Sequence, residues 1–156
     1  MRIALLSDTH IKAGQSLPTF VTDILATVDL TLHAGDIVSE SALSEIETYT
    51  PLVAVAGNGD LLELPPHRVV TCEGIKIGLI HGHQTRNYNS LVQTFAGSDV
   101  RIIVFGHSHV PAKCEYKGHL LFNPGSPTQK RGQQQHSLGV LSIAGSNFSI
   151  DHLYFD

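Results

Sequence analysis

The first third of the sequence alternates between short apolar runs and segments in which apolar residues recur at helical spacing. Apolar runs at 3–6, 30–32 and 52–56 predict buried strands, and the spacing within 17–28 and 39–49 predicts a helix between each pair. Consecutive strand–helix–strand units require parallel strands joined by right-handed crossovers. The opening of the chain therefore predicts an α/β fold.

The pattern changes after the Pro65-Pro66 pair. One further helix is predicted at 88–95, and the remaining apolar runs predict strands, most of them separated by glycine-containing turns that are typical of hairpins. These strands are expected at 68–72, 75–80, 102–105, 112–116, 119–122, 139–143 and 148–154. Parallel strands first and hairpins later predict two packed, mixed sheets with helices on their outer faces.

Length and charge narrow the class of protein. The 156 residues suit a single domain, 1–156. A net charge of −4 argues against nucleic acid as the main partner, because backbone binding requires basic stripes. The N-terminal apolar run is too short for a membrane span and lacks a signal-peptide cleavage pattern. Cys72 and Cys114 form no C-x-x-C pair, so we expect free thiols and a cytoplasmic location.

Five of the apolar runs end directly in polar residues or glycine. Ligands of open α/β sheets bind beyond the carboxyl ends of the strands, so these residues are expected at one rim. The residue types are carboxylates, imidazoles and one amide, which together form a metal-ligand set. Each motif alone is explained as well by a turn, but five in succession are not. They are Asp8-Thr9-His10, Gly35-Asp36, Gly57-Asn58, His81-Gly82-His83 and Gly106-His107-Ser108-His109.

Spacing and glycines predict details of these loops. Asp8 and His10 are two residues apart, so in an extended segment their side chains point to the same face, and His107 and His109 repeat this spacing. The glycines before Asp36, Asn58 and His107 are expected to allow sharp turns and a close approach to the backbone.

This order of motifs resembles that of the calcineurin-like metallophosphoesterase superfamily. The short chain, the H-G-H motif and Asn123-Pro124-Gly125-Ser126 are similar to its small bacterial and archaeal phosphodiesterase family. The resemblance runs essentially from end to end. It implies an α/β fold with a four-layer αββα sandwich of two mixed β-sheets flanked by helices.

The resemblance also implies a dinuclear metal centre. One metal is expected on Asp8, His10, Asp36 and His109, and the second on Asp36, Asn58, His81 and His107, with Asp36 bridging. Mixed oxygen and nitrogen ligands favour two divalent transition-metal ions, Mn²⁺ first, with Fe, Zn²⁺ or Ni²⁺ as alternatives. The expected activity is hydrolysis of a small phosphodiester by a metal-bridging hydroxide that attacks phosphorus.

The catalytic residues beyond the metal ligands are less defined. Asn58 is expected to act in catalysis as well as on a metal. Gly59 stands where many members of the superfamily carry a histidine, which leaves Asp60 without an imidazole to orient. His83 is the best substitute as acid for the leaving group, and a supporting or surface role is an equal alternative.

Two other functions stay open at this stage. A phosphomonoesterase or nucleotidase would use the same residues. A non-catalytic scaffold similar to the retromer scaffold subunit is disfavoured because none of the seven ligands is missing. A homo-oligomer is a further possibility, and no membrane partner is expected.

Several polar residues have no assigned role in the motifs. Arg131 is expected to be a solvated loop residue rather than a phosphate ligand. Asn123 has two interpretations, a hydrogen bond near the site or a turn with Pro124. His33 is expected to be a buried supporting residue, and four histidines are expected at the surface: His67, His119, His136 and His152.

Overall fold

The computed structural model describes residues 1–156 and contains two five-stranded sheets. The strands of the first sheet are β1 (Arg2–Leu6), β2 (Leu30–His33), β3 (Leu52–Ala54), β9 (His136–Ala144) and β10 (Asn147–Phe155). Those of the second sheet are β4 (His67–Cys72), β5 (Ile75–Ile80), β6 (Ile102–Val104), β7 (Ala112–Tyr116) and β8 (His119–Asn123). Each strand predicted from the sequence is therefore present.

Both sheets are mixed, as predicted. In the first sheet the order is β10-β9-β1-β2-β3, with β1, β2 and β3 parallel, β9 antiparallel to β1, and the edge strand β10 antiparallel to β9. In the second sheet the order is β4-β5-β6-β8-β7, with β5, β6 and β8 parallel and β4 and β7 antiparallel at the two edges. The parallel strands of each sheet deliver the loops that carry the polar motifs.

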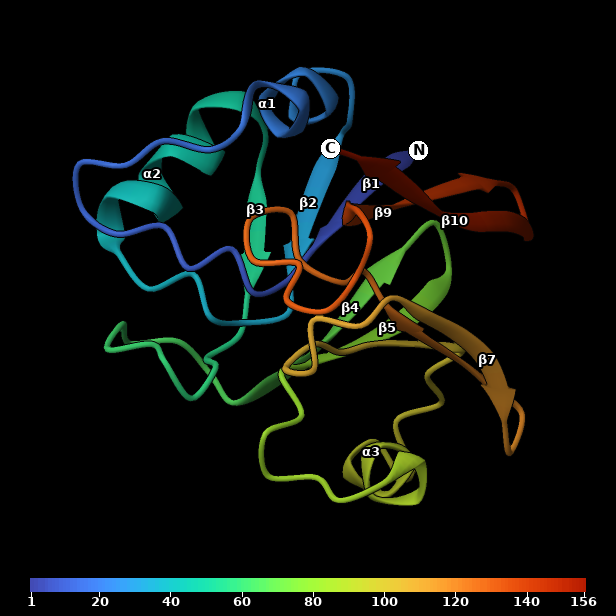
Figure 1. Ribbon diagram of the computed structural model, residues 1–156. Helices are drawn as coiled ribbons and strands as arrows, with labels where there is room; N and C mark the ends of the chain where they lie inside the picture. Colours follow the sequence, from blue (N-terminus) through green and yellow to red (C-terminus); the bar gives the residue numbers. More distant parts are fainter.

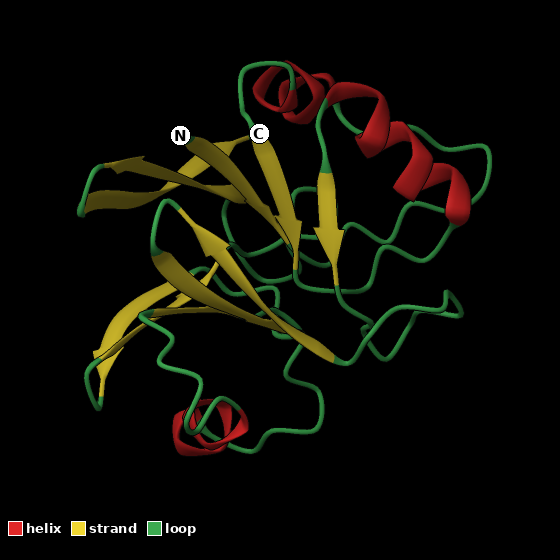
Figure 2. Cartoon of the chain, turned by 180° about the vertical axis from the view of Figure 1, so that it is seen from behind, coloured by secondary structure: helices red, strands yellow, loops and turns green.

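Three helices cover the outer faces. The helices α1 (Thr19–Leu25) and α2 (Glu40–Tyr49) lie on the outer face of the first sheet, and α3 (Tyr88–Thr94) lies on that of the second (Figures 1 and 2). The layers follow the order helix, sheet, sheet, helix. The predicted four-layer αββα sandwich is therefore confirmed.

The core between the sheets is apolar and shared. A cluster of 15 buried residues includes Ile3 and Leu32 from the first sheet and Ile77, Ile102 and Phe122 from the second. A second cluster of 11 residues lies under α1 and α2, and a third of six lies under α3. Because the central cluster joins both sheets, their facing surfaces are held together by burial of apolar area.

Two predicted elements have an end that was wrong by three residues. The first helix begins at Thr19 and ends at Leu25, so it is shorter at both ends than the predicted 17–28; Pro18 precedes it, and proline is tolerated only at a helix start. Strand β9 begins at His136 rather than 139, because His136 pairs with Phe155 of β10. The longest helix has 10 residues, and no helix is long and apolar enough to cross a membrane.

Candidate metal centre

The loops that follow five parallel strands converge where the two sheets meet. The loops after β1, β2 and β3 of the first sheet carry two carboxylates, one imidazole and one amide, whereas the loops after β5 and β6 of the second sheet carry only imidazoles. In chain order the residues are Asp8, His10, Asp36 and Asn58, then His81, His107 and His109. The candidate metal centre therefore lies between the two sheets, and we call the place where these seven residues meet the seam.

Asp36 lies at the middle of this seam. Its Oδ2 atom is 3.4 Å from His10 Nε2 on one side and 3.4 Å from His81 Nε2 on the other. The Oδ1 atom of Asp8 is 3.4 Å from His109 Nε2. Asp36 is thus placed between the two predicted ligand sets, as a bridging carboxylate requires.

Asn58 and His107 complete the group on the side of His81. The Oδ1 atom of Asn58 lies 3.0 Å from His81 Nε2, and the rings of His107 and His81 are 5.3 Å apart between centroids. All seven predicted residues therefore meet at one place. Two groups have ligand atoms within 4.8 Å of one another: Asp8, His10 and His109, and Asp8, Asp36 and His81.

Three polar atoms at the centre are buried without any hydrogen-bond partner. They are Asp8 Oδ1, His10 Nε2 and His109 Nε2. A buried polar atom without a partner costs about 1–3 kcal/mol, so three at one point require an explanation. All three belong to one of the groups that can hold a metal ion, and a cation would satisfy them together. The residues present therefore fit a metal site.

Backbone carbonyls orient two of the imidazoles. The Nδ1–H group of His81 donates to the carbonyl of Ala34 at 2.7 Å, and that of His109 donates to the carbonyl of Gln129 at 2.6 Å. In both rings Nε2 then faces the carboxylates. This arrangement fixes the tautomer and ring direction of a metal-binding histidine.

The ligand loops are not extended, so one step of the sequence argument was wrong. Five of the seven residues have a left-handed backbone, with φ of 54° at Asp8, 45° at His10, 59° at Asp36, 73° at His107 and 62° at His109. The paired side chains converge through these turns rather than through strand alternation. Non-glycine residues with positive φ are uncommon and cluster at functional sites.

Two glycines permit close packing of the loops, as predicted. A Cβ atom on Gly57 would clash with the amide and the carboxylate of Asp36, and one on Gly106 would clash with Ser7 and lie 2.7 Å from Asp8 Oδ2. These positions let the loops after β3 and β6 approach the carboxylates. Any side chain there would displace a predicted ligand.

Asp60 has a role that the sequence analysis missed. Its carboxylate accepts the backbone N–H groups of Asp36 at 2.8 Å, Val38 at 2.7 Å and Gly57 at 2.8 Å. It therefore joins the loop after β2 to the loop after β3, and it needs no imidazole to do so. The only signal in the sequence was its position two residues after Asn58.

His33 joins the loops after β1 and β2, which confirms its predicted supporting role. Its Nδ1 accepts the N–H of Gly35 at 3.1 Å, so Nε2 carries the hydrogen and donates to Thr9 Oγ1 at 3.1 Å. The ring is fully buried, and burial lowers its pKa to about 4. His33 is therefore a neutral link beneath the centre.

The electrostatics of the seam hold the carboxylates ionised. Burial alone would raise the pKa of Asp36, but contacts with His81 and the Gly59 amide outweigh it and lower that pKa. Burial also opposes the shift at Asp8, where His109, His81 and Ser7 lower the pKa. Burial lowers the pKa of His81 and His109, yet pairing with the carboxylates raises both overall. Metal ions and protons therefore compete for these two rings.

Two further candidate residues for the reaction are His83 and Arg131. The exposed ring of His83 lies 5.5 Å from that of His81 and 6.4 Å from that of His107, and burial together with these neighbours lowers its pKa. Arg131 is exposed in a turn, as predicted for a solvated loop residue, and its positive charge makes a small contribution that opposes protonation of His10 and His109.

Both interpretations of Asn123 hold. Its amide donates to the carbonyl of Gly106 at 3.1 Å and to Ser108 Oγ at 3.1 Å, and its carbonyl accepts the N–H of Gly125 at 2.9 Å. Asn123 therefore stabilises its own turn and supports the loop that carries His107 and His109.

The prediction of surface positions was wrong for His152, His119 and His136, the last of which is half-buried with its ring stacked on Phe155. His152 is half-buried, donates to the carbonyl of Asn123 at 2.7 Å and stacks on Phe122. His119 is half-buried and donates to the carbonyl of Val100 at 2.9 Å. Their partners are distant in sequence, so no local pattern indicated them.

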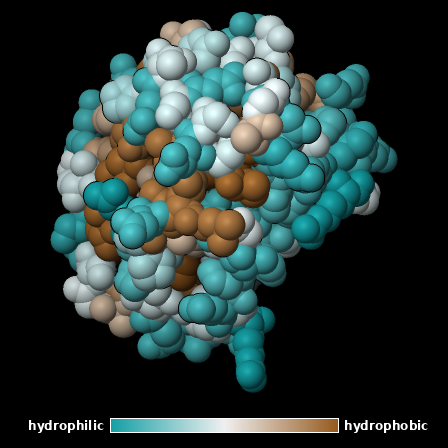
Figure 3. Space-filling view, turned by 90° about the vertical axis from the view of Figure 1, so that its left-hand side faces the viewer, coloured by the Kyte–Doolittle hydropathy of each residue, from teal (hydrophilic) through white to brown (hydrophobic).

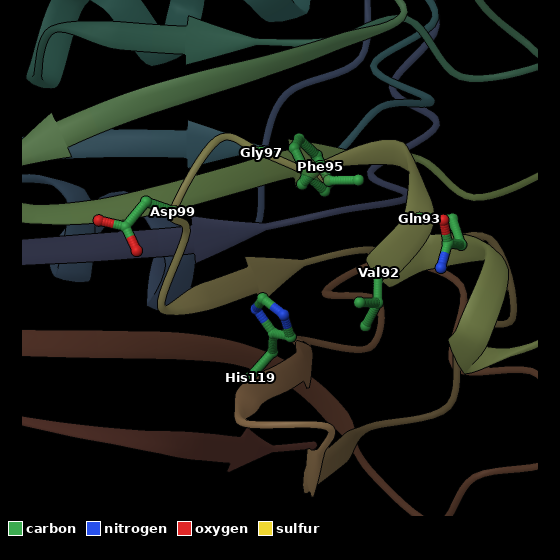
Figure 4. Close-up of a pocket in the computed structure, with 7 residues that line it drawn as sticks. Val92, Gln93, Phe95, Gly97, Asp99 and His119 are labelled. Carbon is green, nitrogen blue, oxygen red and sulfur yellow. The ribbon is translucent and has the colours of Figure 1, made fainter.

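A hollow of about 430 Å³ lies apart from the metal centre, between α3 and the start of β8 (Figure 4). Val92, Gln93 and Phe95 line it on the helix side, and Asp99 and His119 line the opposite side. None of the predicted ligands reaches it. This hollow therefore has no part in the chemistry of the seam.

Known proteins resemble this chain in both sequence and fold. The model of the calcineurin-like phosphoesterase superfamily domain matches residues 1–146. A probable metallophosphoesterase of Methanothermobacter thermautotrophicus is 36% identical over 157 residues, which cover 97% of this chain and 91% of that protein. A structure from Streptococcus pneumoniae, described as a predicted phosphoesterase, is 26% identical with a TM-score of 0.79 and covers 98% of this chain and 88% of that one.

A second solved structure shows the same fold at lower identity. A Vps29 variant from Entamoeba histolytica has a TM-score of 0.82 at 23% identity, with 100% of both chains covered. This likeness concerns the fold alone, because the two sequences differ at most positions.

Proposed function

We propose that this chain, which belongs to the calcineurin-like phosphoesterase superfamily, hydrolyses small phosphodiesters with two divalent metal ions held at the seam. Membership of the family supports a metal-dependent phosphoesterase; the diester class is our proposal. The observation that carries it is the set of three buried, unpartnered ligand atoms beside Asp36, whose Oδ2 lies 3.4 Å from both His10 and His81.

The seven residues of the seam would hold the two ions. We assign Asp8, His10, Asp36 and His109 to one ion and Asp36, Asn58, His81 and His107 to the other. The mixture of oxygen and nitrogen ligands favours Mn²⁺, with Fe, Zn²⁺ or Ni²⁺ as alternatives. Bound ions at such a site polarise the phosphoester and make water more acidic.

The chain itself positions the reacting groups. Asp60 and His33 hold the three loops of the first sheet at fixed spacing, so the carboxylates are pre-organised before any ion or substrate arrives. Asn58 stands exposed beside His81 with its amide free to contact the substrate. We assign it a catalytic role as well as a ligand role.

His83 and Arg131 flank the seam on opposite sides. His83 borders His81 and His107, where we place the departing oxygen, and we assign it the role of supplying a proton. Arg131 borders His10 and His109, where its charge would attract the phosphoryl oxygens. A single cationic side chain near the centre suits the one negative charge of a diester better than the two of a monoester.

A phosphomonoesterase or nucleotidase remains the nearest alternative, because the seam would bind either ester. The scaffold alternative gains support only from the fold of Vps29. Against it stand the complete ligand set and the left-handed backbone at five ligands, a strain that a purely binding surface does not require.

We also propose one domain, 1–156, and a cytoplasmic location. The shared core cluster supports the first, and the free thiols of Cys72 and Cys114 agree with the second. A homo-oligomer is supported by the face that carries α2, where apolar side chains gather inside a polar surround (Figure 3). The loop after β3 lies on this side, and its Leu61 is 98% exposed. Light scattering at several protein concentrations tests this point.

The proposed function is tested by an ester panel on metal-stripped protein. Each divalent ion is added back separately, and diesters and monoesters of the same leaving group are compared by kcat/KM. We expect hydrolysis only with transition metals, strongest with Mn²⁺, and a higher value for the diester. A higher value for the monoester would assign the seam to a phosphomonoesterase.

A further inference from the structure

We infer that a polar cavity beside His83 binds a hydroxylated ester group of the substrate, so that the substrate class is phosphodiesters of a polyol or sugar. This inference rests on the proposed function. The cavity has a volume of about 400 Å³. It lies between the end of β5, the start of β4 and α3, and it falls within the range of roughly 300–1,000 Å³ of small-molecule sites.

The cavity opens next to the metal centre. His83 lines it, and the same ring lies 5.5 Å from that of His81 and 6.4 Å from that of His107. Gly82, with φ of +96°, makes the sharp turn that separates His81 from His83. A phosphodiester at the seam would therefore extend one of its two ester groups past His83 into the cavity.

The lining is polar and carries no carboxylate and no permanent positive charge. Only one of its nine residues is hydrophobic, no lysine, arginine, aspartate or glutamate is among them, and its basic side chains are the imidazoles of His67 and His83. A second phosphate would find no lysine or arginine there, and an apolar group would leave the polar lining without hydrogen bonds at a cost in affinity. The cavity therefore suits a neutral group with polar atoms.

The hydroxyl groups of the lining mainly offer acceptors. The hydroxyl of Thr85 already donates to the carbonyl of Gly82 at 2.7 Å, and that of Thr94 donates to the carbonyl of Ser90 at 3.0 Å. Ser90 donates to Asn87 at 2.9 Å and accepts the N–H groups of Arg86 and Asn87 at 3.3 Å within the N-terminal cap of α3, so its lone pairs are occupied. Lone pairs remain on the hydroxyl groups of Thr85 and Thr94, and they require a hydrogen from the ligand. A hydroxyl group supplies one, whereas a phosphate or an ionised carboxylate does not.

The test compares methyl glyceryl phosphate with methyl propyl phosphate on the metal-loaded protein. Both are dialkyl esters that differ only in two hydroxyl groups, and the rate of each without protein, which for the glyceryl ester includes attack by its own neighbouring hydroxyl, is subtracted. We expect kcat/KM to be roughly tenfold higher for the glyceryl ester, since a hydrogen bond contributes about 0.5–1.5 kcal/mol. Phosphorus NMR of the products follows the reaction.

The matched variants are Thr94→Val and Thr48→Val. Thr94→Val keeps the shape of the lining but removes an acceptor, so the ratio of kcat/KM for the glyceryl ester to that for the propyl ester should fall severalfold. Thr48 of α2 also donates to the carbonyl three residues before it, that of Glu45 at 2.7 Å, but it lies on the other sheet. Thr48→Val should keep the full preference.

Equal rates for the two esters in wild type, or a full preference in Thr94→Val, would overturn the inference. If neither ester is hydrolysed, the proposed function fails. The inference about the cavity is then tested by measuring whether the esters bind to it. In that case the same esters are titrated into metal-free protein by NMR. Saturable amide shifts at 82–94 with the glyceryl ester alone support the cavity, and equal or absent shifts with both esters contradict it.

Discussion

The two sheets contribute different chemistry to the seam. The first sheet supplies every oxygen ligand from loops that are tied together below the surface by Asp60 and His33. The second supplies only imidazoles, and backbone carbonyls set the directions of two of them, His81 and His109. The loops of the first sheet therefore hold the carboxylates in a fixed arrangement, which we call the platform. The imidazoles of the second sheet, His81, His107 and His109, approach it from separate loops, and we call them the arms.

This difference shows how the fold meets the requirements of a cation. Carboxylates held close together repel one another, and backbone N–H donors offset that repulsion at a fixed geometry. Imidazoles bind as neutral ligands and need only the correct tautomer. Ions at the seam would also link the two sheets. Damage to the platform should therefore cost more than the loss of one arm.

The largest effect is expected for Asp36→Asn, which keeps the shape of the bridging residue but removes its charge. Metals contribute several kcal/mol to phosphoryl chemistry, so kcat/KM should fall by roughly a thousandfold and both ions should be lost. The matched variant His10→Ala removes an imidazole that belongs to one ligand set only, so it should lose about 10–100-fold and keep one ion. Metal counted per chain checks both, and two tightly held ions in Asp36→Asn would disprove the bridging assignment.

His33→Gln should change how stability depends on pH. Burial lowers the pKa of folded His33 to about 4 from 6.5, so the unfolded chain binds this proton more readily. The contribution of neutral His33 to the free energy of unfolding is fully present above pH 6.5 and is lost as the pH falls toward 4.

The size of that loss is at most about 3 kcal/mol, because one pKa unit corresponds to about 1.36 kcal/mol. Urea unfolding of metal-free wild type and His33→Gln at pH 7 and pH 4.5 measures it. The variant should show the smaller decrease between the two pH values. Identical decreases would mean that His33 does not act as a neutral link.

Asp60→Asn tests whether the arrangement of the carboxylates depends on the three backbone N–H groups that Asp60 accepts. The amide keeps one acceptor but offers a donor toward backbone N–H groups, so the loops after β2 and β3 should separate. Residues that orient metal ligands typically change metal affinity by about 10–100-fold. Calorimetric titration with Mn²⁺ gives the affinity.

The matched control for Asp60 is Asp29→Asn. Asp29 also accepts a backbone N–H, that of Arg2 at 2.7 Å, but it lies at the opposite end of the sheet. Its substitution should leave metal affinity unchanged. Equal affinities for the two variants would contradict a special role for Asp60.

The smallest expected effect is a difference in Mn²⁺ binding between variants of two imidazoles of the second sheet, His109 and His107. His109 is 1% exposed and is oriented by Gln129, whereas His107 is exposed. We expect His109→Ala to weaken Mn²⁺ binding about tenfold more than His107→Ala, because water replaces an exposed ligand more readily. The reverse order would show that exposure does not rank the arms.

The sequence predicted the sheets and the meeting of the polar motifs at one rim because both depend on local patterns. Apolar runs defined the strands, and polar residues at their ends marked the rim. The tie made by Asp60 could not be predicted, because two of its three partners lie more than 20 residues away in the chain. The left-handed backbone of Asp8 and His10 was missed for a similar reason. It is stabilised by N–H bonds from Asp8 to Gly35 and from His10 to Asp36 on another loop.

The central claim is that ions bridging the two sheets carry out the hydrolysis. The most direct measurement is a titration of metal-stripped protein with Mn²⁺, in which bound ions per chain and diester hydrolysis are followed in the same samples. We predict two ions per chain and a rate that rises with occupancy of the second. Full hydrolysis in the presence of chelator, or a rate that is complete at one ion per chain, would contradict the account.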